Sequence, residues 1–214
     1  MESEADSKAA PSRNERRRER TRAALIDAAI DLVAAQGQDL AIQAITDRAD
    51  VGLGSFYNHF RDKQDIFRAA AADALAVVQR DTVMRTASIP DPLERVAAAF
   101  RLICRISALH PRWAPMIILE GELTLETRQA HVGLLDALLT RLDATELFHG
   151  DDMPLRTSFV IASLRLVMRL RLTDPGFDDA EADKSVELML QMLGVDAETA
   201  RTVCRRPLPE APTA

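Results

Sequence analysis

The residues from Leu53 to Lys63 carry side chains that could recognise the edges of DNA base pairs. Within Leu53-Gly54-Ser55-Phe56-Tyr57-Asn58-His59-Phe60, the serine hydroxyl can donate or accept a hydrogen bond, and the asparagine carboxamide can pair in a bidentate manner with adenine. The leucine could contact a thymine methyl group. The two phenylalanines are spaced to lie on one helical face, and the polar residues fall mostly on the other. We therefore expect a short helix with an apolar inner face and a polar reading face.

A second short helix precedes this reading helix. Ile42, Ile45 and Ala49 recur at steps of three and four residues, which places them on one helical face. Asp50-Val51-Gly52 interrupts that pattern, and both Asp and Gly tolerate the left-handed backbone of a sharp turn. Two short amphipathic helices joined in this way form a helix-turn-helix, whose second helix reads bases in the major groove with its first residues. The residues expected to face the bases are Leu53, Gly54, Ser55 and Asn58.

The same stretch resembles the tetracycline-repressor (TetR) family of transcriptional regulators. The resemblance rests on Gly54-Ser55-Phe56-Tyr57-Asn58-His59-Phe60 with Lys63 three residues on, and on Arg22 with the helix Ala24-Leu25-Ile26-Asp27-Ala28-Ala29, which ends at Gln36-Gly37. It covers roughly the first third of the chain and is specific, because several unlike residues fall at fixed offsets. The remaining two thirds agree only in being helical.

The resemblance implies an all-α protein with an N-terminal three-helix helix-turn-helix domain and a larger helical domain for ligand binding and dimerisation. It implies a sequence-specific DNA-binding transcriptional regulator: a ligand-released repressor that acts as a homodimer on a near-palindromic operator in double-stranded DNA. It also implies that Tyr57, His59 and Lys63 contact phosphates and set the register on the duplex, and that Gln43 contacts DNA.

Several positions depart from the residues that this family commonly has. Ala41 stands in place of Thr or Ser, Thr46 in place of Ala, Asp50 in place of Gly and Gly52 in place of Ser. Without a capping hydroxyl at Ala41, the first motif helix is weaker by about 1 kcal/mol, unless Asp39 caps it instead. These departures keep a second hypothesis open, in which the chain is a helical small-molecule-binding or protein-interaction module that no longer binds DNA.

Composition favours helix over sheet and excludes a polycationic protein. Hydrophobic residues make up 47% of the 214 residues, which is enough for a sizeable core, and β-branched residues do not cluster. Because the formal net charge is −6, attraction to DNA has to come from a local basic patch. The arginine-rich run from Arg13 to Arg22 is either a solvated helix start or an arm that follows the DNA backbone. Its place directly before a helix-turn-helix favours the arm.

Cysteine usage and hydropathy agree with a cytoplasmic protein, and the expected DNA binding implies that it is nucleoid-associated. Cys104 and Cys204 are far apart and provide neither a disulfide framework nor a zinc site. The N-terminus is polar and has no apolar signal core. The most apolar helix, at 159–172, is interrupted by three arginines, so we expect no membrane span.

Shifts in composition divide the chain into four parts. Both ends are polar or rich in proline, which is typical of disordered tails. The expected parts are tails at 1–12 and 207–214, a helix-turn-helix DNA-binding domain at 13–65 with its motif at about 41–60, and a helical effector-binding and dimerisation domain at 66–206. A further break is expected at Ser88-Ile89-Pro90-Asp91-Pro92.

Local start and stop signals place the helices. Thr21 is expected to cap the first helix, which Gly37 ends. Asp62 is expected to cap a later helix that runs to about Arg85. Proline and glycine breaks then delimit the helices of the second region. Their expected ranges are 93–109, 112–119, 124–147, 154–172 and 180–193, with a last turn or two at 197–205.

Apolar side chains of the second region could line a cavity for a small, mostly apolar effector. The candidates are Phe100, Cys104, Trp113, Met116, Ile117 and Met168. For each of them the alternative is plain core, where these residue types are most common. Arg105 and Arg165 on mainly apolar faces would suggest an anionic ligand, or they could pair with Glu120 or Glu122.

The helices expected at 154–172 and 180–193 offer a dimer interface. The first is apolar almost all round, which is typical of a helix buried on most sides, and the second carries an apolar stripe. Two copies of each could pack as a four-helix interface around a twofold axis. The expected interface residues are Phe159, Ala162, Leu166 and Met189.

Catalysis, cofactor binding and metal binding find no support in the sequence. Gly52-Leu53-Gly54 lacks the third glycine of a dinucleotide fingerprint and follows no strand. Glu120, Glu122, Glu126 and His131 are residue types that bind metals, but His131 is five residues from Glu126 and so off the ligand face. We expect no enzyme activity, no cofactor and no metal site.

Overall fold

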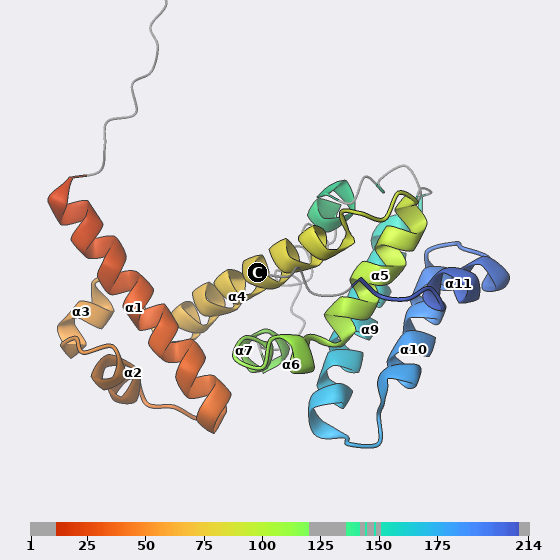
Figure 1. Cartoon of the computed structure of the whole chain (residues 1–214). Helices are drawn as coiled ribbons and strands as arrows, with labels where there is room; N and C mark the ends of the chain where they lie inside the picture. Colours follow the sequence, from red (N-terminus) through yellow and green to blue (C-terminus); the bar gives the residue numbers. More distant parts are fainter. Residues whose placement is uncertain (1–11, 120–135, 142–143, 145–147, 149–150, 210–214) are drawn as a thin grey trace, which may run out of the picture. The chain divides into compact units, whose positions relative to one another are not determined.

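Every regular element in the described part of the chain is an α-helix, which confirms the predicted all-α class. The computed structural model describes residues 12–119, 136–141, 144, 148 and 151–209. The chain forms two compact units, Met1–Ala70 and Ala71–Ala214. Helix α4, Lys63–Thr86, belongs partly to each unit (Figure 1). None of the described helices is long and apolar enough to cross a membrane.

The first unit begins with α1, Arg13–Gln36, which starts well before the predicted cap. Ser12 Oγ accepts a hydrogen bond from the backbone N–H of Glu15 at 3.2 Å, and Glu15 Oε2 accepts one from the Ser12 N–H at 2.6 Å. This capping box and the good helix propensity of arginine stabilise the early start. The prediction that Thr21 caps the helix is therefore wrong, because Thr21 lies inside α1 and its hydroxyl donates to the Arg17 carbonyl at 3.1 Å.

The predicted stop of α1 at Gly37 is confirmed. Gly37 has a φ of 81°, which disfavours any residue with a Cβ, and its N–H donates to the Val33 carbonyl at 2.9 Å. Upstream of this stop, one face of α1 is buried in the first unit. Its buried residues are Leu25, Ile26, Ala28, Ala29, Ile30 and Val33.

The helix-turn-helix consists of α2, Ile42–Arg48, and α3, Leu53–Tyr57. The sharp turn between them is made by Asp50, whose φ of 53° is left-handed as predicted. Ala41 is the N-cap of α2 and no side-chain hydrogen bond caps that end, so Asp39 does not replace the missing hydroxyl. The two short helices are stabilised by packing, since Ile45 and Phe56 are buried and α2 lies against α1.

The predicted signals around α4 are confirmed. Asp62 Oδ1 accepts a hydrogen bond from the Asp65 N–H at 2.8 Å at the start of the helix. The helix ends at Thr86, close to the predicted Arg85, and the predicted break follows it. Asp91 then caps the next helix by accepting from the Glu94 N–H at 2.8 Å.

The helix predicted at 93–109 is divided in two. Helix α5, Pro92–Cys104, ends where Arg105 has φ −94° and ψ 12°, and the short α6, Ile106–Leu109, follows. At the break, the Arg101 carbonyl accepts hydrogen bonds from both the Arg105 N–H at 3.2 Å and Arg105 Nη1 at 3.0 Å. Helix α7, Ala114–Leu119, lies within the range predicted for it.

The core of the second unit lies between α5, α9 and α10, which run beside one another (Figure 1). Helix α9 is Met153–Thr173, α10 is Asp179–Met192 and the last helix, α11, is Ala197–Cys204. Phe100 and Leu190 are fully buried in this core. Of the helix predicted at 124–147, the structure describes residues 136–141, which are helical, and the isolated residue 144; the rest lies outside the described residues.

Candidate nucleic-acid interface

Helix α3 buries one face and presents the other. Phe56 is 0% exposed and Phe60, just beyond the helix, is 3% exposed, and their ring centroids are 5.7 Å apart. Leu53 is 43% and Tyr57 is 57% exposed, although the Tyr57 ring contacts the Phe56 ring edge-on at a centroid distance of 5.3 Å. Large side chains that stay exposed while their neighbours anchor the helix are available for contact with another molecule.

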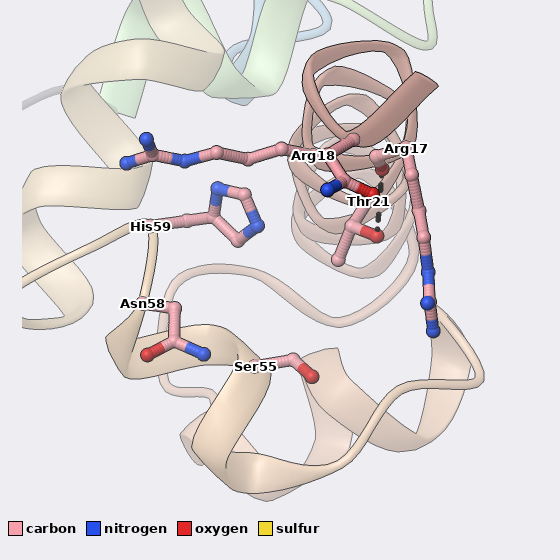
Figure 2. A pocket seen from close by; sticks show the side chains of 7 residues that line it. Arg17, Arg18, Thr21, Ser55, Asn58 and His59 are labelled. Carbon is pink, nitrogen blue, oxygen red and sulfur yellow. Dashed lines mark hydrogen bonds between the residues drawn. The ribbon is translucent and has the colours of Figure 1, made fainter. Parts of the chain in front are cut away.

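An open groove of about 520 Å³ separates the N-terminal half of α1 from the segment Ser55–His59 (Figure 2). One wall is a single helical face of α1, and the other holds the hydroxyl, carboxamide and imidazole of the expected DNA-contacting residues. The lining residues are Asn14, Arg17, Arg18, Thr21, Ser55, Asn58 and His59. The sequence analysis named the last three as DNA contacts and the arginine run as an arm, but it did not single out Asn14 or the groove. The spacing of 14, 17, 18 and 21, which is one helical face, could have indicated it.

His59 is the titratable group of the groove. Partial burial, followed by the positive charges of Arg18 and Arg22, lowers the pKa of His59 below its ordinary value. The guanidinium of Arg22 also lies over the Phe60 ring, 5.3 Å from its centroid. His59 is therefore neutral at pH 7 and can donate a single hydrogen bond to an acceptor in the groove.

The other expected DNA contacts are exposed or half-buried on the same unit. Gln43 is exposed, and its Nε2 donates to Asp47 Oδ1 at 2.6 Å. Gly54 is exposed, and a Cβ added there would meet open space. The Lys63 ammonium lies 5.9 Å from the centroid of the Phe67 ring. Each of these residues is sterically free to meet a ligand at the surface.

Two family models match the chain on either side of Ala71. The model described as "Bacterial regulatory proteins, tetR family" matches residues 25–70, and the one described as "Tetracyclin repressor-like, C-terminal domain" matches residues 91–206, more than half of the chain. The chain belongs to the TetR family. It is a DNA-binding transcriptional regulator, and the family comprises regulators rather than enzymes.

Solved structures of TetR regulators have the same fold. RolR in complex with resorcinol is 29% identical, with a TM-score of 0.72 over 92% of this chain and 98% of RolR. RolR without ligand is 28% identical, with a TM-score of 0.62 over 88% and 99%. A TetR-family transcriptional regulator from Pectobacterium atrosepticum is 20% identical, with a TM-score of 0.62 over 87% and 99%, and shows the fold alone. No curated protein sequence matches the chain.

The residues expected to line an effector cavity of this TetR protein fall in different parts of the second unit. Phe100 and Cys104 belong to the core between α5, α9 and α10, whereas Met168 belongs to a smaller cluster against which Ile117 packs. Burial raises the pKa of the Cys104 thiol to about 12, so it is an inert core group. Met116 is 0% exposed. Trp113 is half-buried, with the Arg112 guanidinium 4.4 Å from its ring centroid.

Arg105 has partners that the sequence analysis did not identify. Its guanidinium forms ion pairs with Asp183 at 2.7 Å and Asp179 at 3.1 Å, both on α10. The suggested pairing partners Glu120 and Glu122 lie outside the described residues. The same holds for Glu126 and His131. Among the described residues, no group of three or more His, Cys, Asp or Glu side chains is placed to hold a metal.

The expected dimer residues differ in exposure. Phe159 is 55% and Leu166 is 57% exposed on α9, and Ala162 between them is half-buried. Within one chain, helix α9 thus buries one face and exposes another, and its burial on most sides in a dimer stays a prediction. Met189 is 1% exposed and packs in the chain's own core, so it is not part of an exposed face; its neighbour Leu188 is 53% exposed instead.

Proposed function

We propose that this regulator is a ligand-released repressor that binds a near-palindromic operator as a homodimer. The observation that carries the proposal is the exposed face of α3, anchored by buried Phe56 and bordered by an arginine-lined groove. In the proposed complex the first residues of α3 read bases, with Ser55 and Asn58 as hydrogen-bonding groups. Tyr57, His59 and Lys63 bind phosphates, and Gln43 supports them from α2.

The dimer is proposed to form through the exposed face of α9. Leu155, Phe159, Ala162 and Leu166 follow one another at helical spacing, and the first two and the last are more than half exposed. An apolar stripe of this kind costs free energy in water and is covered when two copies pack around a twofold axis. The two reading helices would then be about 34–36 Å apart, or somewhat more, on the operator.

The effector is proposed to be a small, mostly apolar molecule bound in the second unit. RolR, which is 29% identical over nearly its whole length, was solved with resorcinol. A small hydroxylated aromatic ring is therefore the first compound class to test. Helix α4 runs without interruption from Lys63 to Thr86, so a shift of its second-unit end is proposed to change the placement of the reading helices.

DNA binding is tested with a duplex that the wild-type protein selects from a random library. Lys63→Ala should weaken binding to all sequences and flatten its salt dependence, because it removes a cationic phosphate contact. Tyr57→Ala should also weaken binding to all sequences, but it should leave the salt dependence unchanged, because tyrosine contributes no positive charge. Ser55→Ala and Asn58→Ala should relax the preference for particular bases instead, at a cost of about 1–3 kcal/mol for each good contact. If no duplex is selected and none is retained at low salt, the proposal is wrong.

Release is tested with resorcinol in the same assay. A coupling free energy of about 1–3 kcal/mol would weaken operator binding roughly 5–150-fold. The matched control is 1,3-dimethoxybenzene, which has the same ring without hydroxyl donors. If a panel of small phenols at saturating concentrations leaves the operator affinity unchanged, this compound class is excluded as the effector. The proposal of DNA binding would not be affected by that result.

A further inference from the structure

The first two turns of α1 form an exposed cationic helix that buries no side chain. Residues 12–20 are all exposed, and they precede the part of the chain that the family model matches, which starts at residue 25. A helical segment without a buried face gains little from packing, and here the capping box of Ser12 and Glu15 holds it. An ordered surface helix that stabilises no core is available for contact with another molecule.

One face of this helix continues the core-facing stripe of α1 beyond the core. Leu25, which is 0% exposed, lies on the same helical face as Thr21, Arg18, Arg17 and Asn14. Where that face passes the end of the core, its residues change from apolar to polar and cationic. They then form one wall of the groove in Figure 2.

The charge of the groove is positive. Two guanidiniums line it and, among the described residues that line it, none is acidic. The two glutamates of the segment, Glu15 and Glu19, lie off this face, about 110° and 150° from its centre by helical spacing, and Glu15 is engaged with Ser12. The lowered pKa of His59 reflects, after burial, the charges of Arg18 and Arg22 at the groove. An anion between the two walls would meet donors from both sides.

We propose that the groove between α1 and the segment Ser55–His59 binds the sugar-phosphate backbone of one operator strand. Arg17 and Arg18 hold the phosphates from one side and His59 holds them from the other, while Ser55 and Asn58 read the adjacent bases. The N-terminal turns of α1 thus form a second DNA-contacting element beside the reading helix α3. This inference rests on the proposed DNA-binding function.

The test compares two double variants that remove equal charge from the same helix. Arg17→Ala with Arg18→Ala removes the two guanidiniums of the groove wall, whereas Arg16→Ala with Arg20→Ala removes two arginines that lie about 110–150° from the centre of that face by helical spacing. All four residues are exposed, so both variants should melt like wild type. Affinity for the selected duplex and for an unrelated duplex of the same length is measured across salt concentrations.

The groove variant should bind both duplexes roughly 10-fold or more weakly, with a salt slope reduced by about 1–2, because it loses phosphate contacts. The control variant should keep most of the affinity. Ethylation interference should show that the groove variant no longer depends on particular phosphates next to the bases that Ser55 and Asn58 contact.

Two results would overturn the inference while leaving the proposed function intact. If the two double variants lose DNA affinity equally, the arginines attract DNA by diffuse charge and not by holding phosphates in the groove. Wild-type affinity in the groove variant, together with weakened binding by Lys63→Ala, would mean that the backbone is held elsewhere. Failure of the wild-type protein to bind any duplex would overturn both proposals together.

Discussion

Arg101 and Asp183 are 82 residues apart in the chain, yet Arg101 Nη2 donates a hydrogen bond to Asp183 Oδ2 at 2.8 Å. The other terminal nitrogen, Nη1, donates to the backbone carbonyl of Arg206 at 2.7 Å. Arg105 adds an ion pair to the same aspartate, with Nη1 and Oδ1 2.7 Å apart. One carboxylate therefore joins α5 to α10, and one guanidinium joins both to the chain after α11.

Asp183→Asn should lower the free energy of unfolding by about 2 kcal/mol, because hydrogen bonds to a charged group are lost. Arg101 then loses its carboxylate partner, whereas Arg105 keeps its ion pair with Asp179. Burial opposes ionisation of Asp183, but hydrogen bonds from Arg101 and Arg105 outweigh it and hold the pKa of Asp183 below its ordinary value of 3.8. The stabilisation is thus present above pH 3.8 and is lost as the pH falls below it. Urea unfolding at several pH values should show the gap between wild type and variant closing in acid, whereas exposed Asp151→Asn should match wild type throughout.

Ala41→Thr should stabilise the protein by about 1 kcal/mol, because Ala41 is an N-cap with φ −76° and ψ 145° and no side chain caps α2. Ala41→Val is the matched control, since valine has the shape of threonine without the hydroxyl. Chemical unfolding of both variants measures the difference. Equal stability of the two would show that the missing hydroxyl is not what weakens α2.

Operator affinity should rise as the pH falls through 6.5, because a phosphate in the groove offsets the charges of Arg18 and Arg22 and raises the pKa of His59 in the complex. In the free protein that pKa lies below 6.5, so the complex takes up a proton that the free protein does not hold. The free protein itself should lose stability as the pH falls through this range, since its fold favours the neutral imidazole. Band shifts at pH 7.5 and 6.0 measure the effect on affinity. His59→Gln should remove the dependence, and His110→Gln should retain it.

Leu166→Glu and Phe159→Glu should each turn a dimer of about twice 23.6 kDa into monomers, because a charge is buried in the proposed α9 interface. Met84→Glu is the control, since Met84 is 60% exposed on α4 outside that face. Light scattering at micromolar concentration gives the masses. Dimers that survive both α9 substitutions would place the interface elsewhere.

Resorcinol should change the emission of Trp113, the only tryptophan, with the same midpoint as operator release. The half-buried ring beside Arg112 is sensitive to any rearrangement around α7. Ile117→Phe, at a half-buried position, should weaken both responses if the effector binds there. Release of operator with unaltered emission would separate the binding site from Trp113.

The local elements of this protein could be predicted because their signals act over a few residues. Gly37 ends α1, Asp50 makes the left-handed turn, Asp62 caps α4, and the break before Pro92 lies where proline and polar residues cluster. Each involves a backbone preference or a hydrogen bond to a residue three or four positions away. For the same reason α3 could be predicted from the sequence, because the spacing of Phe56 and Phe60 and of the polar residues between them defines its two faces.

Tertiary structure decided what each surface meets. Helical spacing predicts an apolar stripe on α10 that includes Met189, but the packing of α10 against α5, α9 and α11 buries Met189, whereas its neighbour Leu188 stays exposed. Arg105 lies where a helix that periodicity predicts to be continuous is divided, and its guanidinium binds aspartates on α10 that are more than seventy residues away. The groove beside α3 exists because the core of the first unit sets α1 next to Ser55 and His59. Periodicity specifies the faces of a helix, but the partner of each face is set by residues distant in sequence, which no local pattern encodes.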